Sequence, residues 1–193
     1  MMKTGIQRIH IFGASGCGVS TLGKALAQRI GAAHLDTDDF YWLPTNPPFR
    51  EKRSIQLRLN LLNNAFILAA PTGWVLSGSL DSWGGPLVPL FKTVIFLEAP
   101  TEVRLERLRA RQLLQFGADA IAPGGWRHGE HTAFLEWAAA YEEGNREGRS
   151  RPRHEAWISQ LPCPVLRLDG TQLIETLVSE VMTALKRLQL AQS

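Results

Sequence analysis

Short apolar runs bounded by Gly, Asp or Pro alternate along the chain with longer amphipathic stretches. This alternation is typical of a parallel β-sheet with helices on both faces. The apolar runs predict strands at 8–12, 33–35, 74–77, 93–97 and 165–168. The amphipathic stretches predict helices at 20–30, 52–70, 101–114, 130–143, 153–160 and 171–189. The expected fold class is therefore α/β, with three layers, α/β/α, around a five-stranded parallel sheet.

The last predicted helix has the clearest pattern, because its apolar side chains recur at spacings of three and four on one face. These side chains are Leu173, Leu177, Val181, Leu185 and Leu188. Asp169 or Thr171 is expected to cap this helix, and Thr101 is expected to cap the helix at 101–114.

Two segments interrupt the alternation. Prolines at 43–49 predict a surface loop, since proline cannot donate a backbone hydrogen bond to a helix or a sheet. The second segment, 116–153, is rich in Gly and Arg and holds a helix between irregular flanks. Long irregular segments in compact domains are commonly functional lids. We expect one domain over 1–193 with a helical lid insertion at about 112–153, called the lid segment below.

Composition narrows the possible partners. The chain has 193 residues and a net charge of +3, from 21 basic and 18 acidic residues. A charge this small implies that any anion is bound by a local cluster, not by a broad basic surface. Arginine outnumbers lysine 16 to 5. This bias fits phosphate binding by the planar guanidinium, and GC-rich coding is an equal alternative.

The sequence shows no sign of a membrane segment or a metal framework. Its apolar stretches are far shorter than the roughly 20 residues needed to cross a bilayer. The first residues lead directly into a strand without a secretory signal pattern, which predicts a cytoplasmic location. Cys17 and Cys163 are far apart and lack metal-ligand spacing, so we expect neither a disulfide framework nor a zinc site.

A glycine-rich segment between the first strand and the first helix has the composition of a phosphate-binding loop. It comprises Gly13, Ala14, Ser15, Gly16, Cys17, Gly18, Val19, Ser20 and Thr21. Glycines allow backbone angles closed to other residues, so that successive N–H groups turn inward and bind phosphate. The helix that follows adds its positive dipole end. Ser20 stands where a hydroxyl would ligate Mg²⁺, so we expect ATP and Mg²⁺ here; an ordinary glycine-rich turn is the alternative.

The loop departs from the pattern G-x-x-x-x-G-K-[ST] at Val19, which stands in place of lysine. Valine supplies no charge to the phosphates, so either an arginine from elsewhere does so or transfer is slow or absent. Lys24 lies more than one helical turn beyond the loop and is a poor substitute. Cys17 stands where a helix N-terminus would stabilise a thiolate, but we favour the simpler interpretation that a small residue fits there.

The loop, the order of elements and an R-x-x-x-R pair at Arg107 and Arg111 resemble the P-loop kinases of nucleoside monophosphates and small metabolites. Adenylate, cytidylate and shikimate kinases belong to this group. Archaeal-type cytidylate kinases are similar also in lacking the loop lysine. The segment 34–42 further resembles P-loop proteins labelled adenylate kinase-like or topology modulation proteins. The resemblance implies a P-loop fold and an ATP-dependent phosphotransferase.

Asp36, Asp38 and Asp39 follow the second strand at its carboxyl end, where ligands bind in open α/β sheets. Carboxylates there hold Mg²⁺ through water, bind a substrate hydroxyl or accept its proton. The resemblance to shikimate kinases implies that the matching aspartate holds substrate hydroxyls, so Asp36 and Asp38 are assigned to catalysis and substrate binding. Helix capping is the alternative, and we expect it of Asp39. The aromatic residues at 40–42 predict packing more than base stacking.

The third predicted strand ends at Ser77, where many P-loop proteins carry an aspartate that organises Mg²⁺. Asp81 is near enough in sequence to replace it. Gly78 and Ser79 are assigned to substrate binding, because the resemblance to shikimate kinases implies close approach of the substrate to the backbone here. The segment 82–86 either borders that pocket or is a plain turn.

The helix at 101–114 carries the arginine pair. Arg107 and Arg111 are four residues apart and share a face, which Arg104 would extend. The resemblance to adenylate kinase-like enzymes implies that one arginine stacks on the adenine and the other reaches phosphate, so both are assigned to catalysis. A solvated basic face paired with Glu102 and Glu106 is the alternative.

The lid segment supplies further cations. They are Arg127, His128, His131, Arg146, Arg149, Arg151 and Arg153. Closure of a lid would bring one of these arginines to the phosphates in place of the lysine, and the sequence does not indicate which one. His128 and His131 have metal-ligand spacing without a third ligand, which favours a surface pair.

These observations predict an ATP- and Mg²⁺-dependent kinase that acts on a nucleoside monophosphate or a small hydroxylated metabolite. The expected partners are ATP and that acceptor, with no membrane. The alternative is a nucleotide-binding regulator that has lost catalysis, as Val19 and Ser77 together suggest. Binding of nucleic acid through the lid arginines is a weaker third hypothesis, because the net charge is small.

Overall fold

A computed structural model describes residues 6–145 and 147–191. Arg146, one of the lid cations expected from the sequence, lies outside the described residues. The described chain forms a five-stranded, wholly parallel sheet in the order β2-β3-β1-β4-β5. The strands are β1 (Gln7–Gly13), β2 (Ala33–Asp36), β3 (Gly73–Ser77), β4 (Thr93–Glu98) and β5 (Val165–Asp169). The predicted strands and the α/β fold class are thereby confirmed.

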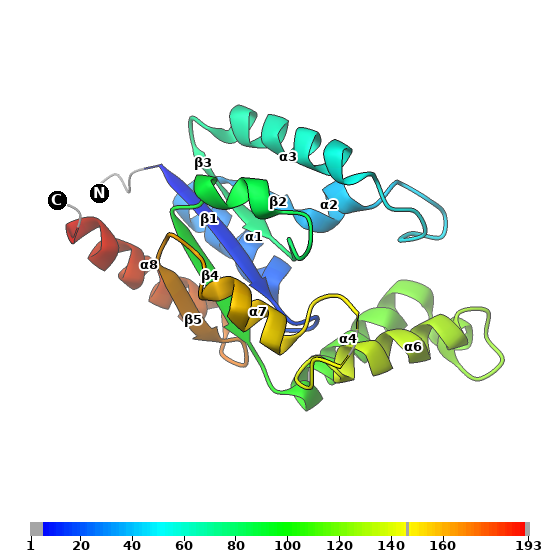
Figure 1. Cartoon of the computed structure of the whole chain (residues 1–193). Coiled ribbons are helices and arrows are strands. Elements are labelled where there is room, and N and C mark those ends of the chain that lie inside the picture. The colour runs from blue at the N-terminus through cyan, green and yellow to red at the C-terminus, as the bar shows by residue number, and fades with distance from the viewer. Residues whose placement is uncertain (1–5, 146, 192–193) are drawn as a thin grey trace.

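Helices cover both faces of the sheet (Figure 1). Those expected from the sequence are α1 (Val19–Ile30), α3 (Ile55–Ala69), α4 (Thr101–Phe116), α6 (His128–Ala139), α7 (Arg151–Ile158) and α8 (Ile174–Leu190). Three short elements were not expected, namely α2 (Thr37–Tyr41), η1 (Gly85–Leu90) and α5 (Ala118–Ile121). No helix within residues 6–145 and 147–191 is both long enough and apolar enough to cross a membrane.

The central strand β1 divides the core into two parts, because successive side chains of a strand point to opposite faces. Ile9 and Ile11 are fully buried on one face, in a core formed with α1 and α8. Phe12 lies on the other face, in a core that α3, η1 and α7 help to form. The sheet is therefore buried on both sides, as a parallel sheet requires.

The expected pattern of α8 holds over most of the helix. Leu177, Val181 and Leu185 are buried, but Leu173 is 75% exposed, because α8 begins only at Ile174. The expected cap is wrong: Asp169 Oδ1 instead accepts hydrogen bonds from Thr171 N at 2.9 Å and Thr171 Oγ1 at 2.7 Å. These bonds close a turn that precedes the helix.

Helix α4 begins beside a buried arginine. Arg104 shares the face of Arg107 and Arg111, as expected, but it is fully buried and makes internal contacts there. Its guanidinium donates from Nε to Ala99 O at 3.1 Å and from Nη1 to Ala138 O at 3.1 Å. Nη2 donates to Thr101 Oγ1 at 2.8 Å. Thr101 therefore pairs with Arg104 and does not cap α4, whose N-cap residue is Pro100.

Arg104 attaches the lid segment to the sheet, since Ala99 follows β4 and Ala138 belongs to α6. In Figure 1, α4 and α6 extend together beyond the carboxyl edge of the sheet. The lid segment thus leaves the sheet next to the glycine-rich loop.

We predict that Arg104→Leu destabilises the protein by about 3 kcal/mol, because buried carbonyl groups lose a charged hydrogen-bond donor. Arg109→Leu, at an exposed position on the same helix, should change stability by no more than about 0.5 kcal/mol. Urea denaturation of the two variants measures both effects. Equal stability of the two variants would contradict the anchoring role of Arg104.

Candidate functional site

The glycine-rich loop joins β1 to α1 in the conformation its sequence predicts. Gly16 has φ +88° and Gly18 has φ +98°, both in the left-handed region that favours glycine. A Cβ on Gly16 would also lie 2.6 Å from the backbone oxygen of Arg104, so no larger residue fits there. Both glycines are therefore required by the turn itself. That the loop binds phosphate stays a prediction.

Cys17 is buried in this loop, with 2% of its surface exposed. Burial raises the pKa of its thiol to about 11, and the nearby Arg104 offsets only part of this effect. The thiol is therefore protonated at neutral pH. This supports the interpretation that a small residue fits the turn, and it disfavours a reactive thiolate.

Val19, in the position of the usual lysine, packs against the core formed by α1 and α8. A cation approaches the loop from the lid segment instead. Arg149 Nη2 donates to Ser15 Oγ at 2.8 Å. Arg127 and Arg153 lie further from the loop residues in their contacts, which are ion pairs with Glu130 at 2.7 Å and with Asp81 at 2.8 Å. Arg149 is therefore the lid arginine best placed to replace the lysine.

The two arginines of the α4 pair, Arg107 and Arg111, have different surroundings. Arg107 Nη1 donates to Gly170 O at 2.9 Å and lies 3.4 Å from the carbonyl oxygens of Gly16 and Cys17. It thereby ties the glycine-rich loop to the turn after β5. Arg111 is exposed one turn further along α4. Its positive charge opposes the rise in the pKa of Asp38 that is described below. The catalytic assignment of both arginines stays a prediction.

Asp36 links the glycine-rich loop to the acidic segment. Its Oδ2 accepts a hydrogen bond from Ser20 Oγ at 2.6 Å, and its Oδ1 accepts one from Asp38 N at 3.1 Å. The second bond makes Asp36 the N-cap of α2, because it ends β2 with extended backbone angles. The expectation that Asp39 is a cap is therefore wrong, since Asp39 lies inside α2.

Asp38 lies in the first turn of α2, within electrostatic reach of Arg149 of the lid segment, and its side chain accepts a hydrogen bond from Trp42. The pKa of its carboxyl is raised, first by partial removal from water and then by the nearby charge of Asp36. Arg149 and Arg111 oppose this shift. A raised pKa makes a carboxylate a better proton acceptor, which suits the predicted catalytic role.

The end of β3 is occupied by packing contacts. Ser77 is fully buried, its Oγ 3.0 Å from His34 Nε2 and 3.4 Å from Val19 O. A Cβ on Gly78, which has φ +110°, would overlap the side chain of Thr37. Glycine is therefore needed at 78 whether or not a substrate binds. Binding of substrate by Gly78 stays a prediction.

Ser79 and Asp81 lie beyond this strand end and line a cavity of about 400 Å³. Ser79 Oγ accepts a hydrogen bond from Asp81 N at 3.2 Å. The Asp81 carboxylate forms an ion pair with Arg153. That Asp81 replaces Ser77 beside a metal stays a prediction. Ser79 stays a predicted substrate ligand.

The aromatic residues after the acidic segment pack as expected. The rings of Tyr41 and Trp42 meet edge to face at 4.8 Å, and the guanidinium of Arg58 lies 3.7 Å from the centre of the Tyr41 ring. Sequence reasoning missed Arg58, which is buried on α3 and whose Nε has no hydrogen-bond partner among the residues that the structure describes. The sequence did contain a signal for a special role of this residue, because Arg58 is the lone charged residue in α3.

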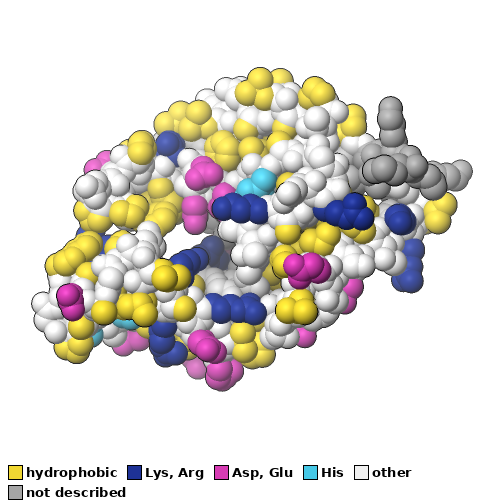
Figure 2. Space-filling model, turned by 180° about the vertical axis from the view of Figure 1, so that it is seen from behind, with side chains coloured by type: hydrophobic (Ala, Val, Ile, Leu, Met, Phe, Trp, Pro, Cys, Tyr) yellow, Lys and Arg dark blue, Asp and Glu magenta, His cyan; other side chains and the backbone are white. Residues whose placement is uncertain are grey.

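The lid segment also contacts the residue that follows the proline-rich stretch 43–49. Glu130, in the first turn of α6, forms ion pairs with Arg50 and Arg127. In the space-filling view, basic and acidic side chains border a hollow (Figure 2).

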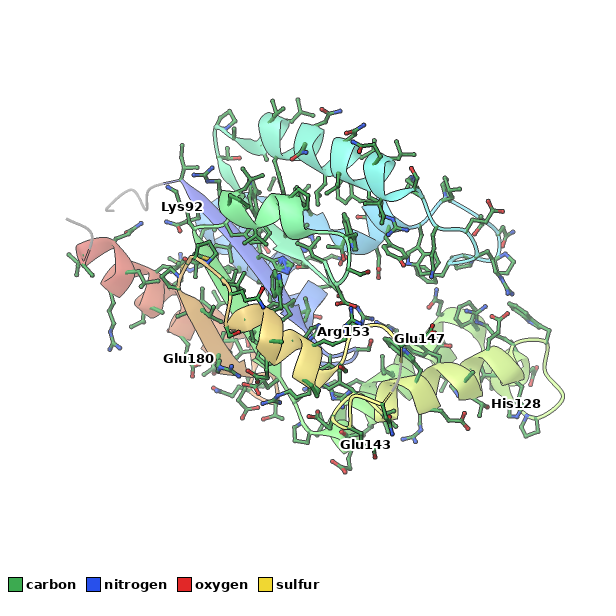
Figure 3. All side chains as sticks on the ribbon, viewed as in Figure 1. Lys92, His128, Glu143, Glu147, Arg153 and Glu180 are labelled. Carbon is green, nitrogen blue, oxygen red and sulfur yellow. The ribbon has the colours of Figure 1, made fainter. Side chains whose placement is uncertain are left out.

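The histidine pair lies away from this site, since His128 is at the far end of the lid segment (Figure 3). His128 Nδ1 lies 3.0 Å from Ile121 O. Residues 6–145 and 147–191 contain no group of three or more His, Cys, Asp or Glu side chains arranged to hold a metal.

The amino-acid sequence of the chain is similar to those of two known proteins described here. No family model matches it. It is 42% identical to YqaC of Bacillus subtilis, an uncharacterized protein, over 176 residues that cover 91% of this chain and 96% of YqaC. The chain belongs to the YqaC family. A weaker match, 29% identical over 115 residues, is to shikimate kinase 2 of Sodalis glossinidius and covers 54% of this chain and 64% of that enzyme.

Solved structures of other proteins share the fold of this chain. A gluconokinase from Sinorhizobium meliloti is 20% identical with a TM-score of 0.51, covering 94% of this chain and 93% of that one. A shikimate kinase from Bacteroides thetaiotaomicron is 19% identical with a TM-score of 0.51, covering 93% and 98%. The fold is thus the P-loop kinase fold expected from the sequence.

We predict that Asp36→Ala lowers the free energy of unfolding by about 1 kcal/mol, because it removes the cap of α2. Asp39→Ala, on an exposed position of the same helix, should change it by no more than about 0.5 kcal/mol. Urea denaturation at neutral pH measures both. A larger loss in Asp39→Ala than in Asp36→Ala would contradict the capping geometry.

Proposed function

We propose that the chain is an ATP- and Mg²⁺-dependent kinase that transfers the γ-phosphate of ATP to a nucleoside monophosphate or a small hydroxylated metabolite. The observation that carries this proposal is the hydrogen bond from Arg149 to Ser15, which brings a cation to a phosphate loop without lysine. Two structural neighbours with the same fold, a gluconokinase and a shikimate kinase, support the proposal.

The side chains present fit both ATP and Mg²⁺. Gly16 and Gly18 permit the conformation of the loop, because both have left-handed backbone angles and a Cβ on Gly16 would collide with the neighbouring backbone. Ser20 and Asp36 place a hydroxyl and a carboxylate 2.6 Å apart, and oxygen atoms of this kind are the ligands that Mg²⁺ prefers. When bound there, Mg²⁺ would neutralise charge on the phosphates.

Each side chain has a distinct part in the proposed transfer. The loop N–H groups and Arg149 bind the phosphates, while Arg107 keeps the loop fixed against the turn after β5. A bond forms between the terminal phosphorus and the acceptor oxygen, and the bond from that phosphorus to ADP breaks. The acceptor proton passes to the Asp38 carboxylate, whose raised pKa favours this role.

One observation favours a second candidate, a nucleotide-binding regulator without transfer activity. Val19 packs into the core, and Ser77 contacts His34, so two positions that serve catalysis in many P-loop proteins have packing roles here. Such a protein would bind nucleotide and release no ADP.

We predict that ATP with Mg²⁺ yields ADP in the presence of an acceptor from a panel of nucleoside monophosphates, sugar acids and shikimate. Asp38→Asn should lower kcat by about 10²- to 10⁴-fold, because the variant lacks the proton acceptor, and should leave the affinity for ATP unchanged. A coupled assay of ADP release measures kcat, with Asp39→Asn as the matched control.

The pH profile gives a second readout of the same assay. Because the pKa of Asp38 is raised above 3.8, its active, ionised form is lost as the pH falls through that raised value. As the pH is lowered, kcat should therefore begin to fall while the pH is still above 3.8, the ordinary pKa of an aspartate. Binding of ATP with no ADP release across the panel would contradict the kinase and favour the regulator.

A further inference from the structure

The cavity of about 400 Å³ lies between the sheet, α3, η1 and α7. These elements lie on the same side of the sheet (Figure 1). Its mouth is near the carboxyl ends of β1 and β3, because Phe12 and Ser79 both line it. Cavities of this size hold small organic molecules. The chain therefore offers a ligand-sized space on the side of the sheet next to the glycine-rich loop.

The walls of the cavity are mainly apolar and aromatic. They include Phe12, Leu59, Leu80, Trp83 and Trp157. A flat ring gains from contact with such walls, whereas a polyol would leave its hydroxyl groups without hydrogen-bond partners. The shape and chemistry of the walls favour a ring system over an open sugar acid.

His10 gives the cavity a polar floor. It is fully buried, its ring stacks on Phe91 with the centroids 5.0 Å apart, and neither of its ring nitrogens has a hydrogen-bond partner within the described residues. Burial lowers the pKa of His10 to about 3, so the ring is neutral at neutral pH. A neutral imidazole presents one N–H donor and one nitrogen acceptor. A ligand with a donor or an acceptor on its edge would satisfy one of them.

The rim connects the cavity to the proposed reaction centre. Asp81 and Arg153 line the cavity as an ion pair, and Figure 3 shows Arg153 at the start of α7. The charges of Asp81 and Asp38 both act on Arg149, which itself contacts Ser15 of the loop. A molecule seated in the cavity would therefore extend toward the loop, Arg149 and Asp38.

We infer that this cavity holds the body of the phosphate acceptor, and that the acceptor is a heteroaromatic alcohol of one or two flat rings with a hydrogen-bonding edge. The inference rests on the proposed function, because the acceptor role requires transfer at the glycine-rich loop. The ring lies against the apolar walls and its edge faces His10. The hydroxyl group projects past Asp81 toward Asp38.

The test uses benzimidazole as the ring probe and D-gluconate as the polyol probe, without nucleotide. Quenching of tryptophan fluorescence reports binding, because Trp83 and Trp157 line the cavity. Leu59→Trp should fill the cavity and weaken benzimidazole binding at least 10-fold. Leu68→Trp is the matched control, since Leu68 is 83% exposed on the same helix. His10→Phe should weaken binding through loss of the polar edge alone.

Turnover separates this inference from the proposed function. We expect ADP release with 2-(hydroxymethyl)benzimidazole and Mg²⁺-ATP, reduced at least 10-fold in Leu59→Trp and unchanged in Leu68→Trp. Three results would overturn the inference. The first is that the wild type does not bind benzimidazole, and the second is that binding survives in both Leu59→Trp and His10→Phe. The third is ADP release with gluconate but not with the ring alcohol.

Thermal stabilisation by Mg²⁺-ATP is measured in parallel and should be equal in the wild type and all three variants. Absence of both this stabilisation and any ADP release, with benzimidazole still bound in the cavity, would mean that the proposed kinase function has failed. In that case the cavity is a ligand site but not an acceptor site, and the inference is overturned for that separate reason.

Discussion

The contact between Arg149 and Ser15 brings a positive charge onto a glycine-rich loop whose lysine position is occupied by valine. Phosphate groups need both the inward N–H groups of such a loop and a cation, and here the two come from distant parts of the chain. The arginine that contacts the loop here belongs to the lid segment. The acidic segment and the cavity gain a chemical role only if this arrangement binds phosphate.

Polar contacts, both buried and exposed, connect the lid segment and α4 to the glycine-rich loop and to the rest of the chain. Arg104 fixes the start of α4 to α6, and its own backbone oxygen faces Gly16 across a gap that a Cβ would fill. Arg107 binds the loop to the turn after β5 from the same helix. Glu130 joins the lid segment to Arg50. The position of Arg149 therefore depends on contacts spread over the whole lid segment.

Hydrophobic periodicity was sufficient to predict the sheet and the longer helices, because each has a clear apolar run or face. It could not predict α2, since a helix of five residues has too little pattern, and its cap was misplaced from Asp36 to Asp39. The burial of Arg104 was not predicted, because sequence spacing does not show that α6 covers the start of α4. The lid arginine and the cavity involve residues more than 50 positions apart, a separation that no local pattern reports.

The most direct measurement of the central claim is the affinity of Mg²⁺-ATP, determined by titration calorimetry in the wild type and in Arg149→Leu. The account predicts one site per chain in the wild type and binding at least 10-fold weaker in Arg149→Leu. The control Arg109→Leu, which removes an exposed arginine of α4, should bind like the wild type. Failure of the wild type to bind, or equal affinity in Arg149→Leu, would contradict the claim that this arginine replaces the missing lysine.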